Sequence, residues 1–383
     1  ITPTPSTTDD PTSGDETSDS GSPTTVKSQT ITNISTTQSG TAPLVENSGN
    51  NGNLVTATLP PGVSITSEGS AEAQSSEQAQ QSLTQSIQNR NTAPDTEQSL
   101  IQQAQDFLDS LPQDNKVDVR SIIPTTTSAS QGQPIVITGS SSLSTSQTEA
   151  FVIDLTRMPA DAPTQLQLHN IDYTVIIGPA VITGGTGSNV VLADDYPQSI
   201  VLGADDDTLD GGGGNDTIGS AAGNDLLIGG QGRDLITGGA DDDILKGGPQ
   251  ADSLIGGFGD DNLSGGQGRD TLRGSRGNDN LKGQKFNDLL HGGAGDDTLF
   301  GGQGKDILKG GEGADTFRLS KGKDTIKDFS IRDGDVIDAP KNFPLQIVQR
   351  GEHLLLRDNT RNIKTTILNI SQNDLIQYQS DLI

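Results

Sequence analysis

The sequence contains no cysteine and no tryptophan, and aromatic residues make up only 3% of its 383 residues. The absence of cysteine excludes disulfide bonds, thiolate metal sites and cysteine nucleophiles. Few aromatic side chains are available to fill a large conventional core. Since the sequence also has no run of about 18 apolar residues, no segment is expected to cross a bilayer as a helix.

Positive charge is scarce as well. Lysine and arginine total 24 against 51 acidic residues, which gives a formal net charge of −27 at pH 7. This charge argues against nucleic acid and anionic membranes as partners, because both would repel the chain, and it favours cations. The chain begins at Ile1 without an initiating methionine or a signal segment, which predicts a fragment or a processed product.

The motifs of several common enzyme classes are missing. The sequence has no H-E-x-x-H, no G-x-S-x-G and no G-x-x-x-x-G-K-[ST]. The only histidines, His169, His291 and His353, lie far apart in the sequence. Residues 117–183 are too few for a glycosidase domain. The sequence therefore predicts a protein that is not an enzyme.

Glycine, by contrast, is abundant, with 48 residues, and much of it belongs to a nine-residue repeat. In each unit, positions one, two and four are mostly glycine, position six is aspartate and position eight is apolar. The aspartates recur fourteen times without an exception, as Asp207, Asp216, Asp225, Asp234, Asp243, Asp252, Asp261, Asp270, Asp279, Asp288, Asp297, Asp306, Asp315 and Asp324. Every position eight between Leu209 and Ile326 is leucine, isoleucine or phenylalanine.

A fixed period of this length predicts a solenoid, in which each unit buries its apolar face against its neighbours. Positions one to six form a glycine-rich turn and positions seven to nine form a short strand. Two units then make one coil, and residues 18 positions apart stack at a strand spacing of about 4.8 Å. The aspartates therefore fall into two columns of seven, one from Asp207 to Asp315 and one from Asp216 to Asp324.

Carboxylates stacked in this way require a cation. Two bare anions about 5 Å apart repel by about 3 kcal/mol at an effective dielectric of about 20, whereas a whole domain is stabilised by only about 5–15 kcal/mol. Calcium fits best, because it accepts about six to eight oxygen ligands in flexible geometry, and zinc prefers thiolates and imidazoles. Six gaps in each column allow up to about twelve ions.

Backbone carbonyls are expected to complete each calcium site, because glycine lets the turns direct peptide oxygens toward the ion. The predicted metal ligands are thus the fourteen aspartates together with carbonyls of the loops. The loop carbonyls are those of Gly229, Gln231, Gly238, Gly247, Gly256, Gly265, Gln267, Gly292, Gly301 and Gln303, and those at equivalent positions.

The unit GGQGRDLIT at residues 229–237 resembles the nonapeptide of the RTX (repeats-in-toxin) calcium-binding family, and the resemblance covers about 184–327. It implies an all-β, right-handed parallel β-roll that is disordered without calcium and folds outside the cell. It also implies an extracellular or cell-surface bacterial protein, exported by type I secretion machinery without an N-terminal signal peptide. Residues 324–329 resemble the segment that closes such arrays, and residues 381–383 resemble the end of their C-terminal secretion signals.

The region before the repeats divides by composition. Residues 1–69 are rich in Ser, Thr, Pro and Asp and predict a disordered linker. Residues 70–116 predict a helical segment, with a weak helix at 71–89 and a second helix that begins with a capping box at Asp95 and ends before Pro112.

The regions that flank the repeats predict strands. Residues 117–183 form a β-rich cap at the N-terminal end of the solenoid, residues 184–327 form the roll, and residues 328–383 form a C-terminal β cap that includes the secretion signal. The turns that precede Asp207 keep the apolar position at Val191 and lack the metal ligand. Strands are expected at 134–137, 151–153, 173–177, 345–348, 354–356 and 365–368.

Two units depart from the glycine pattern. Gln284 and Phe286 replace glycine at positions two and four before Asp288, and Gln250 replaces the position-four glycine before Asp252. Glycine reaches backbone conformations that are costly for other residues. The calcium sites that involve Asp252 and Asp288 are therefore expected to be weakened or empty.

Two functions remain open. In the first, the protein is a secreted calcium-binding structural component of a cell surface, matrix or fibre, which associates with itself or with a cell-surface partner. In the second, the chain is the export-and-folding module of a larger toxin, adhesin or enzyme. The missing catalytic motifs favour the first function, and the missing initiating methionine keeps the second open.

Overall fold

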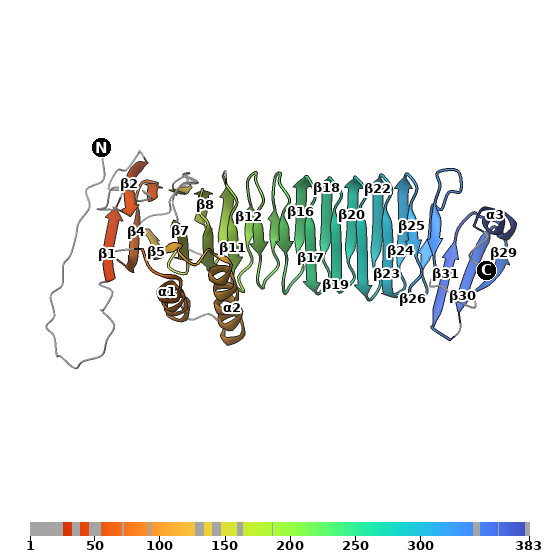
Figure 1. The fold of residues 1–383 in the computed structure, drawn as a ribbon, viewed down its shortest axis with the longest axis horizontal. Helices are drawn as coiled ribbons and strands as arrows, with labels where there is room; N and C mark the ends of the chain where they lie inside the picture. Colours follow the sequence, from red (N-terminus) through yellow and green to blue (C-terminus); the bar gives the residue numbers. More distant parts are fainter. Residues whose placement is uncertain are drawn as a thin grey trace. The chain divides into compact units, whose positions relative to one another are not determined.

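The computed structural model describes residues 26–32, 39–45, 55–70, 73–90, 93–126, 134–139, 147–158, 164–185, 187–339, 345–358 and 360–379. The chain divides into two compact units, Ile1–Gly203 and Ala204–Ile383 (Figure 1). The first residues of the predicted roll, 184–203, thus belong to the first unit, and all fourteen position-six aspartates belong to the second.

The first unit contains two sheets, with strand orders β1-β4-β5-β7-β9-β11 and β2-β3-β6-β8-β10-β12. Their bounds are Val26–Thr32 (β1), Gly40–Val45 (β2), Val55–Leu59 (β3), Val63–Ser70 (β4), Lys116–Thr126 (β5), Ile135–Thr138 (β6), Gln147–Asp154 (β7), Thr164–His169 (β8), Tyr173–Ile177 (β9), Ala180–Gly184 (β10), Val190–Ala193 (β11) and Ser199–Val201 (β12). The antiparallel pairs are β1 with β4, β4 with β5, β2 with β3 and β3 with β6. The later strands of both sheets pair parallel. The antiparallel strands β1 to β4 precede the β-rich cap predicted over 117–183, and the strands predicted at 134–137, 151–153 and 173–177 correspond to β6, β7 and β9.

The prediction of a disordered linker over 1–69 is wrong for the part that contains β1 to β4. β3 and β4 belong to different sheets and are joined by a tight turn, in which Val63 N donates to Pro60 O at 3.2 Å. Val55, Ile65 and their inward neighbours are buried. The threonines and serines of these strands lower the mean hydropathy. They therefore hide the alternation of apolar and polar positions that is typical of a strand, although threonine, valine and isoleucine favour strands. Residues 1–25 lie outside the described residues.

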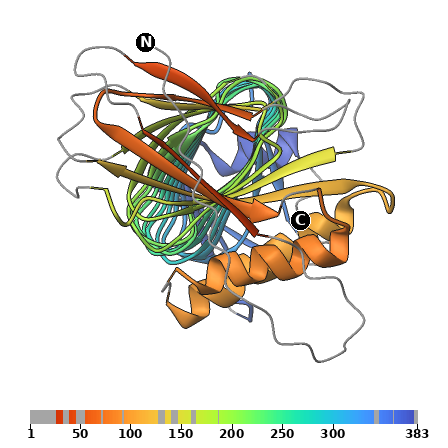
Figure 2. The same cartoon turned by 90° about the vertical axis from the view of Figure 1, so that its left-hand side faces the viewer.

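Two helices cover one face of the first unit's sheet, in keeping with the predicted helical segment (Figure 2). They are α1, Ser76–Gln88, and α2, Pro94–Ser110. The capping box lies at α1, where Ser75 and Gln78 satisfy each other's backbone N–H groups, and not at Asp95 as predicted. α2 instead begins with Pro94 at its first turn and has no side-chain cap.

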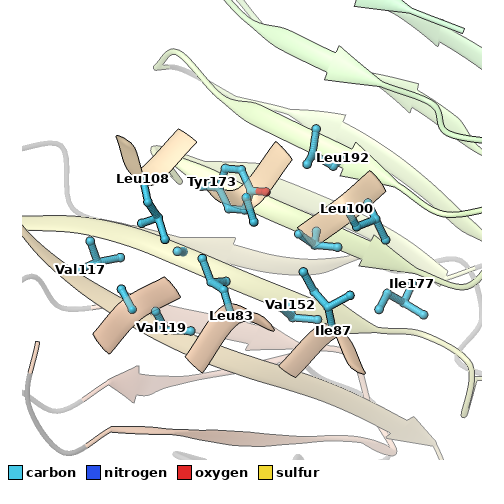
Figure 3. Packing of buried hydrophobic residues seen from close by; sticks show 14 residues of the cluster. Leu83, Ile87, Leu100, Leu108, Val117, Val119, Val152, Tyr173, Ile177 and Leu192 are labelled. Atoms are coloured by element: carbon cyan, nitrogen blue, oxygen red, sulfur yellow. The ribbon is translucent and has the colours of Figure 1, made fainter. Parts of the chain in front are cut away.

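The apolar faces of both helices pack on β5, β7 and β9 (Figure 3). Leu83 and Ile87 of α1 and Leu100 and Leu108 of α2 are buried there. Phe107 stacks on the ring of Tyr173 with 4.4 Å between the ring centroids. This cluster is a conventional helix-on-sheet core, which the low aromatic content of the whole chain did not predict.

The second unit consists of short parallel strands that alternate between two sheets (Figure 1). One sheet contains β13 (Thr208–Asp210), β15 (Leu226–Ile228), β17 (Ile244–Pro249), β19 (Asn262–Gln267), β21 (Asn280–Lys285), β23 (Thr298–Gly304), β25 (Thr316–Arg318), β26 (Lys321–Gly322) and β28 (Val336–Asp338). The other contains β14 (Thr217–Gly219), β16 (Leu235–Ala240), β18 (Ser253–Phe258), β20 (Thr271–Arg276), β22 (Leu289–Ala294), β24 (Ile307–Glu312) and β27 (Thr325–Ile326).

Paired strands of the second unit lie 18 residues apart, as Leu245 with Leu263 and Leu254 with Leu272. This register confirms the coil of two nonapeptides and the parallel β-solenoid. The position-eight side chains from Leu209 to Ile326 are all buried, so they form the thin core expected between the sheets.

The C-terminal end is covered by the predicted β cap. β29 (Gln346–Arg350), β30 (His353–Asp358) and β31 (Ile363–Ile367) pair antiparallel, and the helix α3 (Gln372–Tyr378) follows them. The residues 381–383 that resemble a secretion signal lie outside the described residues. Among the helices that the structure describes, none is long and apolar enough to cross a membrane.

Replacing Leu83 by alanine is expected to destabilise the first unit by about 2–5 kcal/mol, because it removes a fully buried side chain between α1 and the sheet. The measurement is thermal unfolding followed by near-ultraviolet circular dichroism, which reports the stacked Tyr173. The matched control is Gln81→Ala on the exposed face of α1. Equal stability of the two variants would contradict this packing.

Candidate metal centres in the coil loops

The fourteen position-six aspartates are buried in two columns, as the sequence predicts. Within each column, Oδ1 of one carboxylate accepts a hydrogen bond from the backbone N–H of the aspartate 18 residues earlier, and Asp234 N lies 2.9 Å from Asp252 Oδ1. Twelve such bonds link successive members from Asp207 to Asp324. One oxygen of each linked carboxylate is thus fixed by the backbone of the neighbouring coil.

The second carboxylate oxygen has no such partner along the middle of the columns. In the eight successive aspartates from Asp234 to Asp297, Oδ2 is buried and no hydrogen-bond donor reaches it within the described residues. A buried anionic oxygen without a donor or a cation carries a large desolvation cost. The rows of Oδ2 atoms therefore require positive charge that the side chains of the coil do not supply.

Position-one glycines leave space beside these oxygens. At Gly238, the place where a Cβ atom would stand lies 2.2 Å from Asp243 Oδ2 and 2.7 Å from Gly256 O. The corresponding place at Gly247 lies 2.4 Å from Asp252 Oδ2 and 2.7 Å from Gly265 O. Any side chain here would collide with the carboxylate, which explains why position one is glycine.

These spaces are lined by one carboxylate oxygen and one backbone carbonyl, the donor types that calcium prefers. The structure thus places the predicted carbonyls of Gly256 and Gly265, and in the same way those of Gly229 and Gly301, next to the spaces. The carbonyl of Gly247 also accepts a hydrogen bond from Gly230 N at 3.0 Å. No group of three or more His, Cys, Asp and Glu side chains suited to a metal occurs within the described residues.

Burial raises the pKa of the aspartates in the columns. The pKa reaches about 7 for Asp243, Asp252 and Asp261, chiefly because burial disfavours the charged carboxylate. The backbone N–H bond opposes this rise, and neighbouring carboxylates in the column add to it. Without a cation, the columns therefore hold protons near neutral pH, and a divalent ion would replace them.

The ends of the columns differ from the middle. Asp324 Oδ2 accepts a bond from Ser320 Oγ at 2.8 Å, so protein donors reach both oxygens of the last predicted ligand. The other column continues one step further than predicted, because Asp315 N donates to Asp335 Oδ1 at 3.0 Å. Asp335 Oδ2 in turn accepts from Ser330 N at 2.7 Å. The columns thus end in carboxylates that the protein itself satisfies.

Asp335 escaped the sequence analysis because two extra residues precede it, which makes its spacing from Asp315 20 residues instead of 18. The signal that could have found it is the triplet Asp335-Val336-Ile337, which repeats the pattern of aspartate at position six and an apolar residue at position eight.

Before the columns, position six is occupied by an amide. Gln198 Oε1 accepts a bond from Ala180 N at 3.1 Å, just as an aspartate would, and Gln198 Nε2 donates to Gly178 O and Asp194 Oδ1 at 3.1 Å each. The amide supplies its own donors, so this turn needs no cation. It matches the prediction of N-terminal turns that keep the fold and lack the metal ligand.

The departures from glycine keep the left-handed backbone that glycine has elsewhere. Gln250, Gln284 and Phe286 have φ values of 73°, 76° and 76°, which costs free energy for residues with a Cβ atom. Asp252 and Asp288 nevertheless keep their bonds in the columns, at 3.0 Å to Asp270 and 2.9 Å to Asp306. The predicted weakening of these two sites would therefore come from strain, and it stays a prediction.

Two rows of buried carboxylate oxygens beside glycine-lined spaces define a metal-binding β-solenoid. Eight overlapping segments between residues 183 and 326 match the family model of the RTX calcium-binding nonapeptide repeat. Over these residues the chain carries RTX calcium-binding nonapeptide repeats. No curated protein matches the chain.

Replacing both Asp234 and Asp252 by asparagine is expected to raise the calcium concentration needed for folding several-fold. Asparagine keeps the Oδ1 acceptor and removes the negative charge of Oδ2. At a calcium concentration of about 100 times Kd, each lost site would remove about 2.7 kcal/mol of stabilisation. The measurement is a calcium titration followed by far-ultraviolet circular dichroism.

The control for this titration is the double variant Asp242→Asn and Asp260→Asn, which changes charge equally in the loops of the following units, at the opposite edge. Both residues are exposed at position five and lie outside the columns. The control should keep the wild-type midpoint. If both double variants shift the midpoint by the same amount, general charge and not ligation would govern folding.

Without calcium, the roll is expected to be more stable at pH 5 than at pH 8. The pKa of Asp288 and Asp297 is about 7 in the folded chain and ordinarily 3.8, so the folded chain binds more protons between these values. The stabilisation is therefore present at acid pH and lost as the pH rises through about 7. Circular dichroism in chelator at both pH values measures it, and greater folding at pH 8 would contradict the assignment.

Proposed function

We propose that this protein is a secreted structural component of a cell surface, matrix or fibre whose roll folds on meeting extracellular calcium. The observation that carries the proposal is the unbroken row of donor-free carboxylate oxygens from Asp234 to Asp297. A roll whose buried oxygens need cations over its whole length suits a long, repetitive element that is built only where calcium is present.

The folding mechanism follows from the roles of the residues in each coil. Position-six aspartates would hold the ion with the loop carbonyls, position-one glycines leave the space, and position-eight side chains form the core. Calcium would supply the positive charge that brings the carboxylates of successive coils together. Extracellular calcium modules bind at about 10⁻⁴–10⁻³ M, so the chain would stay unfolded in calcium-poor cytosol and could pass an export channel of the type I class.

A role without catalysis is supported by the structural roles that the repeated residues of the second unit have in every coil. In each coil the glycines form the turn, the position-six aspartate is the expected ligand and the position-eight side chain fills the core. His291 stands on a strand beside Arg273 and Lys309, and burial, followed by these two cations, lowers its pKa. The fold of the first unit, with its own helix-on-sheet core, supports a tethering or docking part next to the roll. We therefore propose that the chain is not an enzyme.

The alternative function is the export-and-folding module of a larger toxin, adhesin or enzyme, which would use the same calcium-dependent folding. The β cap from β29 to β31 favours it as well, because it continues the sheet from β27 and covers one end of the roll.

Sedimentation velocity at about 5 mM calcium and after chelation distinguishes the two functions, since this concentration exceeds the usual Kd of extracellular modules. A structural component should form large calcium-dependent assemblies from a compact folded chain. A compact species that stays monomeric at all protein concentrations would favour the folding module and contradict the structural role.

A further inference from the structure

The two edges of the roll carry opposite charge. Each coil crosses from one sheet to the other at one edge and returns at the opposite edge. The loops that lead into the odd-numbered strands from β13 to β23 form the acidic edge. Its charged residues are Asp205, Asp206, Asp241, Asp242, Asp260 and Asp296. The returning loops, with the strand residues just before them, form the basic edge, made of Arg233, Arg269, Lys285, Lys305, Lys321 and Lys323.

All twelve of these side chains are exposed, and none belongs to the ligand columns. Neither edge carries a residue of the opposite charge at positions four and five, if the buried column aspartates are set aside. At position three, Arg276 lies on the acidic edge with its guanidinium 5.0 Å from the ring of Phe258. The separation by sign is unusual for a surface, where mixed charges normally alternate. It therefore points to a partner that recognises the edges.

Backbone hydrogen bonds hold the acidic edge as a ladder. Asp242 Oδ1 accepts from Asp260 N, and Asp260 Oδ1 accepts from Asn278 N, both at 2.7 Å. The same bond joins Asp296 Oδ1 to Ala314 N at 2.7 Å. These carboxylates are thus fixed at the spacing of the coils and need little ordering when they bind.

The basic edge repeats with the same spacing. Its position-five residues also lie 18 residues apart in the stack, and Lys305 N donates to Asn287 Oδ1 at 2.9 Å. Several coils of each edge carry the charge, so the acidic edge of one molecule can face the basic edge of a second molecule at the same coil spacing. Exposed aromatics accompany both edges, since Phe286 is 58% exposed in a loop of the basic edge and Phe258 is 57% exposed beside the acidic edge.

Calcium would also remove the obstacle to such an association. The chain carries −27 charges, so two metal-free copies repel each other. If all of about twelve sites were filled, the ions would add about +24, and −27 + 24 leaves about −3. The opposite charges of the two edges would then dominate the encounter of two copies.

We propose that the roll self-associates side by side, with the acidic edge of one copy on the basic edge of the next. This inference rests on the proposed structural function and deepens it by naming the partner, a second copy of this chain. The contact joins two different surfaces, so a bound pair still presents one free acidic edge and one free basic edge. Such a heterologous contact does not close on itself, and it extends into a sheet or fibre.

The test uses the full chain in millimolar calcium and two charge-reversed variants. Arg269→Glu with Lys305→Glu reverses two of the six charges of the basic edge, and Asp260→Lys with Asp296→Lys reverses two of the six charges of the acidic edge. Each variant alone should need at least about ten times more protein to associate than the wild type, as measured by sedimentation velocity. An equimolar mixture of the two variants should associate again. High salt should weaken wild-type association, because it screens exposed charges.

The matched control is Lys246→Glu with Lys282→Glu, which changes the net charge as much as the basic-edge variant but lies on a sheet face, in β17 and β21. It should associate like the wild type, and circular dichroism should show calcium-dependent folding of every variant. Association that survives both edge variants, or is lost equally in the control, would overturn the edge contact and leave the proposed function standing. A wild type that folds with calcium but never associates would overturn both.

Discussion

The structure depends on one electrostatic constraint, the burial of carboxylate oxygens that no protein donor reaches. From Asp234 to Asp297 one oxygen of each carboxylate is tied to the next coil and the other faces an oxygen-lined space. The glycine at position one, the left-handed turns and the thin core all serve to bring these oxygens together. Calcium, which the RTX nonapeptide repeats bind, would supply the positive charge that these oxygens lack.

The ends of the columns show the same constraint in another form. Where the rows stop, the protein supplies the missing donors itself, with Ser320 at Asp324 and the backbone of Ser330 at Asp335. On the N-terminal side, the amide of Gln198 takes the place of a carboxylate and carries its own donors. At both ends of the columns, the position-six groups thus have hydrogen-bond donors from the protein or carry their own. Only the coils between these ends would need a cation.

Much of the second unit could be predicted from the sequence, because its period is strict. Because every ninth position is apolar and paired strands lie 18 residues apart, Leu263 is expected in the core between the two sheets, stacked on Leu245. The first unit was harder to predict, since Val55 and Ile65 stand among threonines and serines whose polarity resembles that of a disordered segment. Asp335 was missed because an insertion of two residues shifts its spacing, and only the three-dimensional register restores it to the column.

The account makes calcium binding and folding one event, and a titration that records both tests this most directly. The wild-type chain would be titrated with calcium at pH 7.5, with bound ions counted by equilibrium dialysis and folding followed by far-ultraviolet circular dichroism on the same samples. The account predicts that both curves rise together and cooperatively, at about 10⁻⁴–10⁻³ M calcium. A roll that is already fully folded in chelator at this pH, or that binds calcium without any change in folding, would contradict it.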